Sequence, residues 1–103
     1  NMCIDVAARL DQLGRQPYSA KSFIERFQDR VLFGTDYEGR FDEARTRSFY
    51  HTHFRFFQTR DEYFDHPFPD MLGQWKIFGL GLAEPVLRKL YHDNATRIFN
   101  LGA

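Results

Sequence analysis

Apolar residues gather in two short runs in the first third of the chain. Residues 2–6 are apolar except for Asp5, and residues 30–35 hold Val31, Leu32 and Phe33 in succession. Short apolar runs bounded by turn residues are typical of buried strands. About 25 residues separate the two runs, which is enough for a crossover connection, so we predict a parallel pair.

The segment between these runs predicts helix. Residues 7–13 are expected to form a helical turn that ends before Gly14. Ser19 is predicted to cap the next helix, since its hydroxyl can accept a hydrogen bond from a free amide of the first turn. This helix should reach about residue 29. Its buried face would carry Phe23, Ile24 and Phe27.

Helical spacing returns in the second half of the chain. Asp42 is predicted to cap a helix that runs to about residue 58. Residues 65–73 contain prolines and glycine and should form a loop, while residues 75–82 should be extended or irregular. A last helix should begin near Pro85, and Asn100 and Gly102 are its stop signals. Its apolar stripe comprises Val86, Leu87, Leu90, Tyr91, Ala95, Ile98 and Phe99.

Length and composition indicate one small globular unit. The chain has 103 residues, of which 43% are hydrophobic and 27% charged. Its formal net charge of zero argues against nucleic-acid or membrane-surface partners. A single cysteine excludes an internal disulfide, and no apolar run is long enough to span a membrane. We expect a cytoplasmic protein. Because an apolar run begins directly after Asn1, we expect residues 1–103 to be a partial domain, the C-terminal piece of a longer protein.

Asp36 is the main candidate for chemistry. It follows Gly34 and Thr35 at the carboxyl end of the second predicted strand. Ligands of parallel α/β folds bind at that end of the strands. A carboxylate there can hold a metal or accept a proton from a metal-activated water. An aspartate after a strand is also common turn chemistry, so spacing alone leaves both interpretations open.

Two motifs carry a family resemblance. "RVLFGTDY" resembles the final-strand motif of metal-dependent hydrolases of the amidohydrolase superfamily, in the amidohydrolase-related group that also contains decarboxylases. "LAEPVLRKLYHDNATRIFNL" resembles the closing helix of that group, and the opening "NMCIDVAARLDQLGRQP" resembles its preceding strand and loop. The resemblance covers most of the chain and is weakest over residues 38–73.

This resemblance implies an α/β fold in which the chain supplies the last two parallel strands, with their helices, of a (β/α)8 TIM barrel. It implies that Asp36 is the catalytic carboxylate next to a divalent metal, expected to be zinc, whose other ligands lie on earlier strands. The implied reaction is hydrolysis of an amide, ester or lactone-type bond in a small-molecule substrate. The alternatives are a non-oxidative decarboxylase, in which Asp36 mainly holds the metal, and a non-catalytic aromatic-rich interaction module.

The four histidines are weaker candidates. His51 and His53 form a His-x-His pair, which is the metal signature of the family's first strand. Here the pair lies in a helical pattern, where residues two apart point about 200° from one another, so we expect solvated or stacked rings. His66 lies in the proline-rich loop, where a substrate contact is the less favoured interpretation. His92 should lie on the surface.

Three residues of the first strand region need separate interpretation. Asp5 is expected to pair with an arginine or with loop amides, because an apolar strand does not hold an unpaired charge. Arg9 follows in the loop and is a candidate for binding a substrate carboxylate. Cys3 is expected to be a small core residue.

The run "RSFYHTHFRFF" interleaves bases with aromatic rings. Single-strand nucleic-acid binders use such rings for stacking, but the zero net charge and the helical spacing favour a packed aromatic face. That face could rest on the rest of a barrel or on a second subunit, so a homo-oligomer is one expectation.

Overall fold

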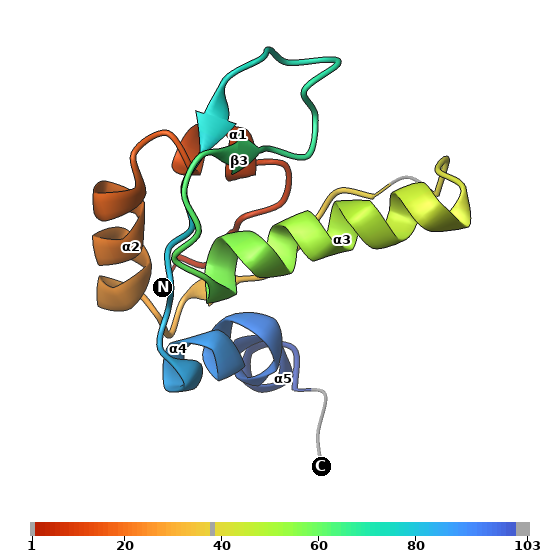
Figure 1. Cartoon of the computed structure of the whole chain (residues 1–103). Coiled ribbons are helices and arrows are strands. Elements are labelled where there is room, and N and C mark those ends of the chain that lie inside the picture. The colour runs from red at the N-terminus through yellow and green to blue at the C-terminus, as the bar shows by residue number, and fades with distance from the viewer. Residues whose placement is uncertain (1, 38, 101–103) are drawn as a thin grey trace.

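The computed structural model of the chain describes residues 2–37 and 39–100. The fold is α/β, with two small sheets among helices (Figure 1). Its elements, in chain order, are β1 (Ile4–Asp5), α1 (Leu10–Leu13), α2 (Pro17–Arg26), β2 (Val31–Leu32), α3 (Glu43–Gln58), β3 (Phe64–Asp65), β4 (Lys76–Ile77), α4 (Glu84–Arg88), a π-helical turn (Lys89–Asp93) and α5 (Asn94–Ile98).

The two predicted strands pair in parallel, which confirms the crossover prediction. Ile4 pairs with Val31 and Asp5 with Leu32. The strands are shorter than predicted, because the chain turns immediately after Val6 and places Ala8 at a φ of 55°. In the described part of the chain, β1 pairs with β2 alone.

The exposure of β1 corrects one prediction and settles another. Cys3 is exposed and not a core residue, because nothing in the described residues covers its side of the strand. Asp5 is exposed as well. Its carboxylate accepts a hydrogen bond of 3.1 Å from the amide of Ala7, so the pairing with loop amides is confirmed.

Helix α2 begins three residues earlier than predicted. Gln16 is its N-cap residue, Pro17 occupies the first turn, and Ser19 lies inside the helix, so the prediction of a Ser19 cap is wrong. Proline suits the first turn because its fixed φ matches the helix and its missing N–H needs no partner there. Ile24 is buried, whereas Phe23 is partly exposed.

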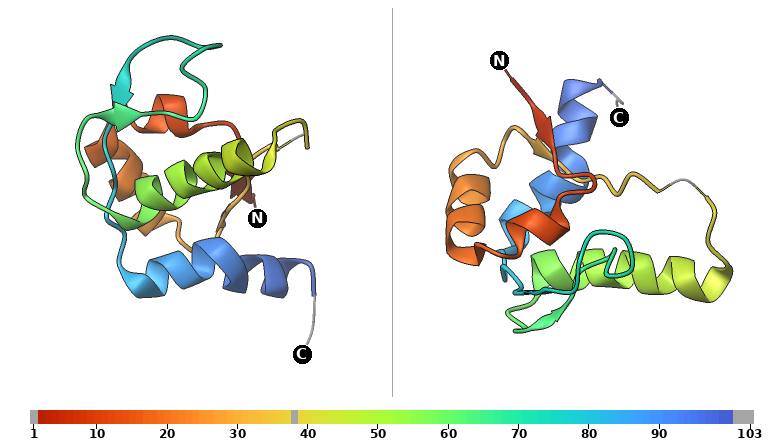
Figure 2. Two further views of the ribbon diagram at one scale, coloured as in Figure 1. Left: turned by 45° about the vertical axis from the view of Figure 1, so that its right-hand side comes forward. Right: turned by 90° about the horizontal axis from the view of Figure 1, so that it is seen from above.

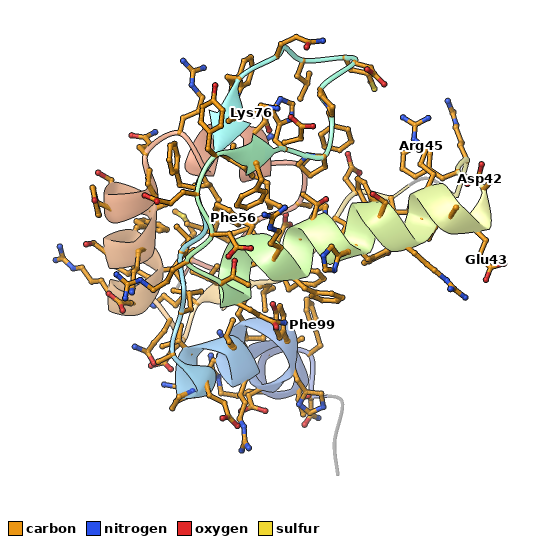
Figure 3. The ribbon with its side chains drawn as sticks, in the orientation of Figure 1. Asp42, Glu43, Arg45, Phe56, Lys76 and Phe99 are labelled. Carbon is orange, nitrogen blue, oxygen red and sulfur yellow. The ribbon has the colours of Figure 1, made fainter. Side chains whose placement is uncertain are left out.

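Helix α3 has the predicted bounds and the predicted cap. The Asp42 carboxylate accepts a hydrogen bond of 2.8 Å from the amide of Arg45. Asp42, Glu43 and Arg45 lie at the end of the helix that projects from the rest of the chain, while Phe56 lies in the interior (Figure 3). The aromatic run packs inward as expected, since Phe49, Phe56 and Phe57 are buried.

Replacement of Asp42 by alanine should lower the free energy of unfolding by about 1 kcal/mol, because an orphan amide of the first turn loses its acceptor. Asparagine at the same position keeps the acceptor and should lose only a few tenths of a kcal/mol. Urea unfolding of the two variants measures the difference. Equal losses in both variants would show that the cap bond contributes nothing to stability.

Strand β3 was not predicted: Phe64 precedes the expected loop, and Asp65 was assigned to that loop. Phe64 pairs with Ile77 and Asp65 with Lys76 in an antiparallel hairpin. Phe64 and Ile77 are buried, and Asp65 forms an ion pair with Lys76. Seen from above, the hairpin loop, residues 66–73, overlies α3 (Figure 2, right), and its Phe68 ring contacts that of Phe49 on α3 with centroids 5.6 Å apart.

The last helix runs as one rod from α4 to α5, with Pro85 in its first turn as predicted. At its π-helical turn the amide of Asn94 bonds to the carbonyl of Lys89, five residues earlier. The carbonyl of Leu90 is thereby released from the helix ladder and accepts a hydrogen bond of 3.0 Å from the amide of Phe33. The helix thus covers the edge of β2 that faces away from β1.

One hydrophobic core joins these parts. Its buried members come from helices α1 to α4, the π-helical turn, both sheets and the segments that connect them: Val6, Leu10, Ala20, Ile24, Val31, Phe56, Phe57, Phe64, Ile77, Leu80, Leu82, Val86 and Leu90. In the described residues, no helix combines the length and the apolar character needed to cross a membrane.

Candidate active site

The carboxyl ends of β1 and β2 lie close together. A Cβ atom on Gly34 would lie 3.2 Å from the Cβ atom of Ala7, so glycine allows the segments after β1 and β2 to approach each other. Each segment then turns at a residue with left-handed backbone conformation: Ala8 after β1, with a φ of 55°, and Asp36 after β2, with a φ of 59°. Aspartate tolerates this conformation better than most residues, whereas alanine does not favour it.

Asp36 projects from this end of the sheet. Its side chain is exposed, and within residues 2–37 and 39–100 its carboxylate forms no hydrogen bond or ion pair. The amide of Tyr37 is bonded to the Thr35 hydroxyl at 3.2 Å, so Thr35 and not Asp36 satisfies that turn amide. An unpaired carboxylate at a strand end is available to a ligand, a metal or a water.

Hydroxyl groups fix the backbone on both sides of Asp36. The Thr35 hydroxyl donates to the Tyr50 hydroxyl at 3.4 Å, which ties the strand end to α3. The Tyr37 hydroxyl lies 2.9 Å from the Thr46 hydroxyl, one helical turn earlier on α3. Asp36 is therefore held between two anchored neighbours.

A cavity of about 330 Å³ opens beside Asp36. This volume reaches the lower end of the range of small-molecule sites, roughly 300–1,000 Å³. Four segments form it: the turn after β1, the loop after β2, helix α3 and the β3–β4 loop. Its lining residues are Ala8, Asp36, Tyr37, Arg40, Phe41, Phe49, Phe68, Met71 and Leu72.

Arg9 lies next to this cavity in sequence but does not line it. Its side chain is exposed, and its Nη1 atom donates a hydrogen bond of 3.1 Å to the carbonyl of Ala8. A contact between Arg9 and a substrate would require the guanidinium to leave this bond. The arrangement gives Arg9 no direct place in the site, and its substrate role stays a prediction.

The His-x-His pair on α3 is split between the two faces of the helix, as its spacing predicts. His51 is exposed, whereas His53 is fully buried and its ring contacts those of Phe49 and Phe33. The Nδ1 atom of His53 lies 2.8 Å from the carbonyl of Phe49 and must donate to it. Its Nε2 atom is buried with no partner among the described residues.

Burial lowers the pKa of His53, and the bond to the Phe49 carbonyl opposes this effect only in part. The unfolded chain therefore binds the proton more readily than the folded chain does. The free energy of unfolding should fall as the pH drops below the ordinary histidine pKa of 6.5 and level off below the folded pKa. The substitution His53→Gln should remove this dependence of the free energy of unfolding on pH, whereas the matched control His51→Gln should keep it. Urea unfolding of both variants between about pH 7 and 5 measures the difference. An unchanged slope in His53→Gln would assign it to another group.

His66 and His92 show no ligand-binding geometry. The Nδ1 atom of His66 accepts a hydrogen bond of 3.0 Å from the amide of Phe68, so the proton lies on Nε2, which donates to the carbonyl of Gly73 at 2.8 Å. His66 is thus a structural link within the hairpin loop. His92 is exposed beside Asp93, as predicted.

The residues that the structure describes do not form a complete metal centre. No group of three histidine, cysteine, aspartate or glutamate side chains within residues 2–37 and 39–100 is arranged to hold an ion. Asp36 offers a single carboxylate, of the oxygen-ligand type that divalent metals accept. The described residues therefore fit one ligand of a site and not a full set.

Sequence reasoning located Asp36 but not the cavity beside it. Phe49 was assigned to a packed aromatic face of a helix and Phe68 to a loop, and their convergence depends on how the β3–β4 loop folds back on α3. The one available signal was the density of aromatic residues over the segment where the family resemblance is weakest.

Comparison with known proteins gives one match. The sequence model of a family described as Amidohydrolase matches residues 6–101, which is most of the chain. The comparisons with curated proteins and with solved structures gave no significant match.

Proposed function

Because the chain belongs to the amidohydrolase family, we propose that it forms part of a metal-dependent hydrolase that cleaves an amide, ester or lactone-type bond. The observation that carries this proposal is the exposed carboxylate of Asp36, at the carboxyl ends of two parallel strands and beside a cavity. The net charge of zero supports a small-molecule substrate over nucleic acid or an acidic membrane.

We propose that the two parallel strands are part of a (β/α)8 barrel. In support, the outward edge of β1 is open, because the described residues supply no backbone partner for the Asp5 amide. A further strand can add there. The other edge of β2 is bonded to Leu90 and Asn94, so closure of a barrel on that side would replace at least the Phe33–Leu90 bond.

The remaining ligands of the metal, proposed to be zinc, would come from parts of the protein outside this chain. When bound, a divalent metal polarises the scissile carbonyl and acidifies a water molecule. The part of Asp36 is proton transfer. One carboxylate oxygen accepts the proton of the attacking water and then returns it to the leaving group, which contributes typically about 10²–10⁴-fold to the rate.

The decarboxylase alternative uses the same carboxylate without proton transfer from water. Asp36 would then act mainly as a metal ligand. The two reactions differ in product: a hydrolase turns one substrate and one water into an acid and an amine or alcohol, whereas a decarboxylase releases CO₂. Product analysis on the full-length protein therefore separates them.

Metal removal tests the proposal as a whole. Dialysis of the full-length protein against a chelator should abolish hydrolysis of a panel of amides, esters and lactones, and added zinc should restore it. Circular dichroism before and after dialysis serves as the control for folding. Full activity of the folded, metal-depleted protein would contradict the proposed mechanism.

A further inference from the structure

We propose that the cavity beside Asp36 binds a flat, uncharged apolar ring of the substrate, and that the β3–β4 loop, residues 66–73, is its selective wall. The inference rests on the proposed function for the identity of the ligand as a substrate. It adds the chemical class of the group that lies next to the scissile bond and the residues that select it.

The lining of the cavity is aromatic. Tyr37 and Phe41 have ring centroids 5.5 Å apart, Phe41 and Phe49 5.4 Å, and Phe49 and Phe68 5.6 Å, all in tilted or edge-to-face geometry. An aromatic guest gains from such edge and face contacts beyond the area that it buries. A saturated ring of the same size gains only the free energy of burying its apolar surface.

The charges of the lining favour an uncharged guest. Of the nine lining residues, only Asp36 and Arg40 carry a formal charge, and the others are aromatic or aliphatic. A charged group placed among these rings would lose its hydration without gaining hydrogen bonds. The ring therefore fills the apolar part, and the reacting bond lies at the Asp36 side.

The wall is held in place before any ligand binds. His66 is 1% exposed and bridges Phe68 to Gly73 with its two ring nitrogens. Its ring lies 5.0 Å from that of Trp75, whose Nε1 atom donates to the carbonyl of Asp11 on α1 at 2.9 Å. These contacts fix the loop that carries Phe68 against α1, and the Phe49–Phe68 ring pair fixes it against α3.

The rim of the wall leaves large apolar side chains exposed. Met71 is 75% exposed and Leu72 is 47% exposed, and both line the cavity. Exposed apolar side chains around a cavity are typical of a binding site. A ligand ring would cover them, while methionine adapts to rings of different shape.

Two neutral probes test the inference in the full-length protein. Benzyl alcohol and cyclohexylmethanol are similar in size and contain no bond that a hydrolase can cleave. Ligand-detected NMR titration should show benzyl alcohol binding about fivefold or more tightly than cyclohexylmethanol. Phe68→Ala should weaken benzyl alcohol about tenfold and Met71→Gln about threefold.

Met2→Gln is the matched control for Met71→Gln, since Met2 is 71% exposed and lines a different groove. It should leave binding unchanged. Asp36→Asn should keep benzyl alcohol binding within about twofold, because that residue acts on the bond and not on the ring. If Asp36→Asn retains turnover while Phe68→Ala still weakens the probe, the proposed role of Asp36 fails and the ring site stands. If the full-length protein hydrolyses no amide, ester or lactone yet binds benzyl alcohol as expected, the proposed function fails and the ring site stands.

Three results would overturn the inference. They are no benzyl alcohol binding by an active enzyme, equal binding of the two probes, and a structure of the full-length protein in which another segment fills the cavity. Equal affinities for Met71→Gln, Phe68→Ala and the unaltered protein would also exclude this loop as the wall.

Discussion

Replacement of Asp36 by asparagine in the full-length enzyme is expected to lower the turnover of a hydrolytic reaction by at least about 10²-fold, and by up to about 10⁴-fold. The amide keeps the shape of the side chain but cannot accept the proton of the attacking water. Turnover is measured with metal supplied to both proteins, so that a weakened metal affinity does not account for the loss.

Stability should respond differently from turnover. The Asp36 carboxylate is exposed and bonds to no other described residue, so its removal costs the folded state little. The melting temperature of Asp36→Asn should stay close to that of the unaltered enzyme. Asp70→Asn is the matched control, because Asp70 is an exposed loop aspartate that does not line the cavity beside Asp36. Near-normal turnover of Asp36→Asn would remove the residue from the mechanism.

The pattern of apolar and polar residues predicted the parts of the fold that local chemistry determines. The Asp42 cap, the bounds of α3 and the parallel pairing of β1 with β2 follow from side-chain capping, helical spacing and connection length. Ser19 failed as a cap because Pro17 is itself a good first-turn residue and starts the helix earlier. Both Pro17 and Ser19 are suitable residues for the start of a helix, and the spacing of the apolar residues does not distinguish between the two starts.

Features that depend on distant segments were not predictable. Cys3 was assigned to a core that the described residues do not build around β1. Strand β3 forms because Phe64 pairs with Ile77 across the hairpin loop. A strand of two residues has no local sequence pattern that distinguishes it from the irregular segment after a helix. The position of Asp36 at the end of a predicted strand made it a candidate site residue from the sequence alone. The cavity beside it could not be predicted, because it forms where the β3–β4 loop meets α3.

The largest loss of stability is expected from the last helix, at Asn94. This side chain is fully buried, and its Nδ2 atom donates hydrogen bonds of 2.6 Å to the carbonyl of Gln28 and 2.9 Å to that of Val31. The first carbonyl lies in the turn before β2 and the second lies on β2 itself. Asn94 therefore fixes the start of the strand that leads to Asp36.

Asn94→Leu should lower the free energy of unfolding by about 2–4 kcal/mol, because two backbone carbonyls lose their donor and each unsatisfied buried group costs about 1–3 kcal/mol. Asn94→Asp should be at least as destabilising, since it places an acceptor oxygen against the carbonyls of Gln28 and Val31. Gln58→Leu is the matched control: its exposed amide donates one bond, to the Tyr91 hydroxyl, and its loss should cost less than about 1 kcal/mol. Urea unfolding of the three variants decides the matter. A loss in Asn94→Leu no larger than that in Gln58→Leu would mean that water or a rearranged turn satisfies both carbonyls, and that β2 is positioned by its pairing with β1 and by the Phe33–Leu90 bond alone.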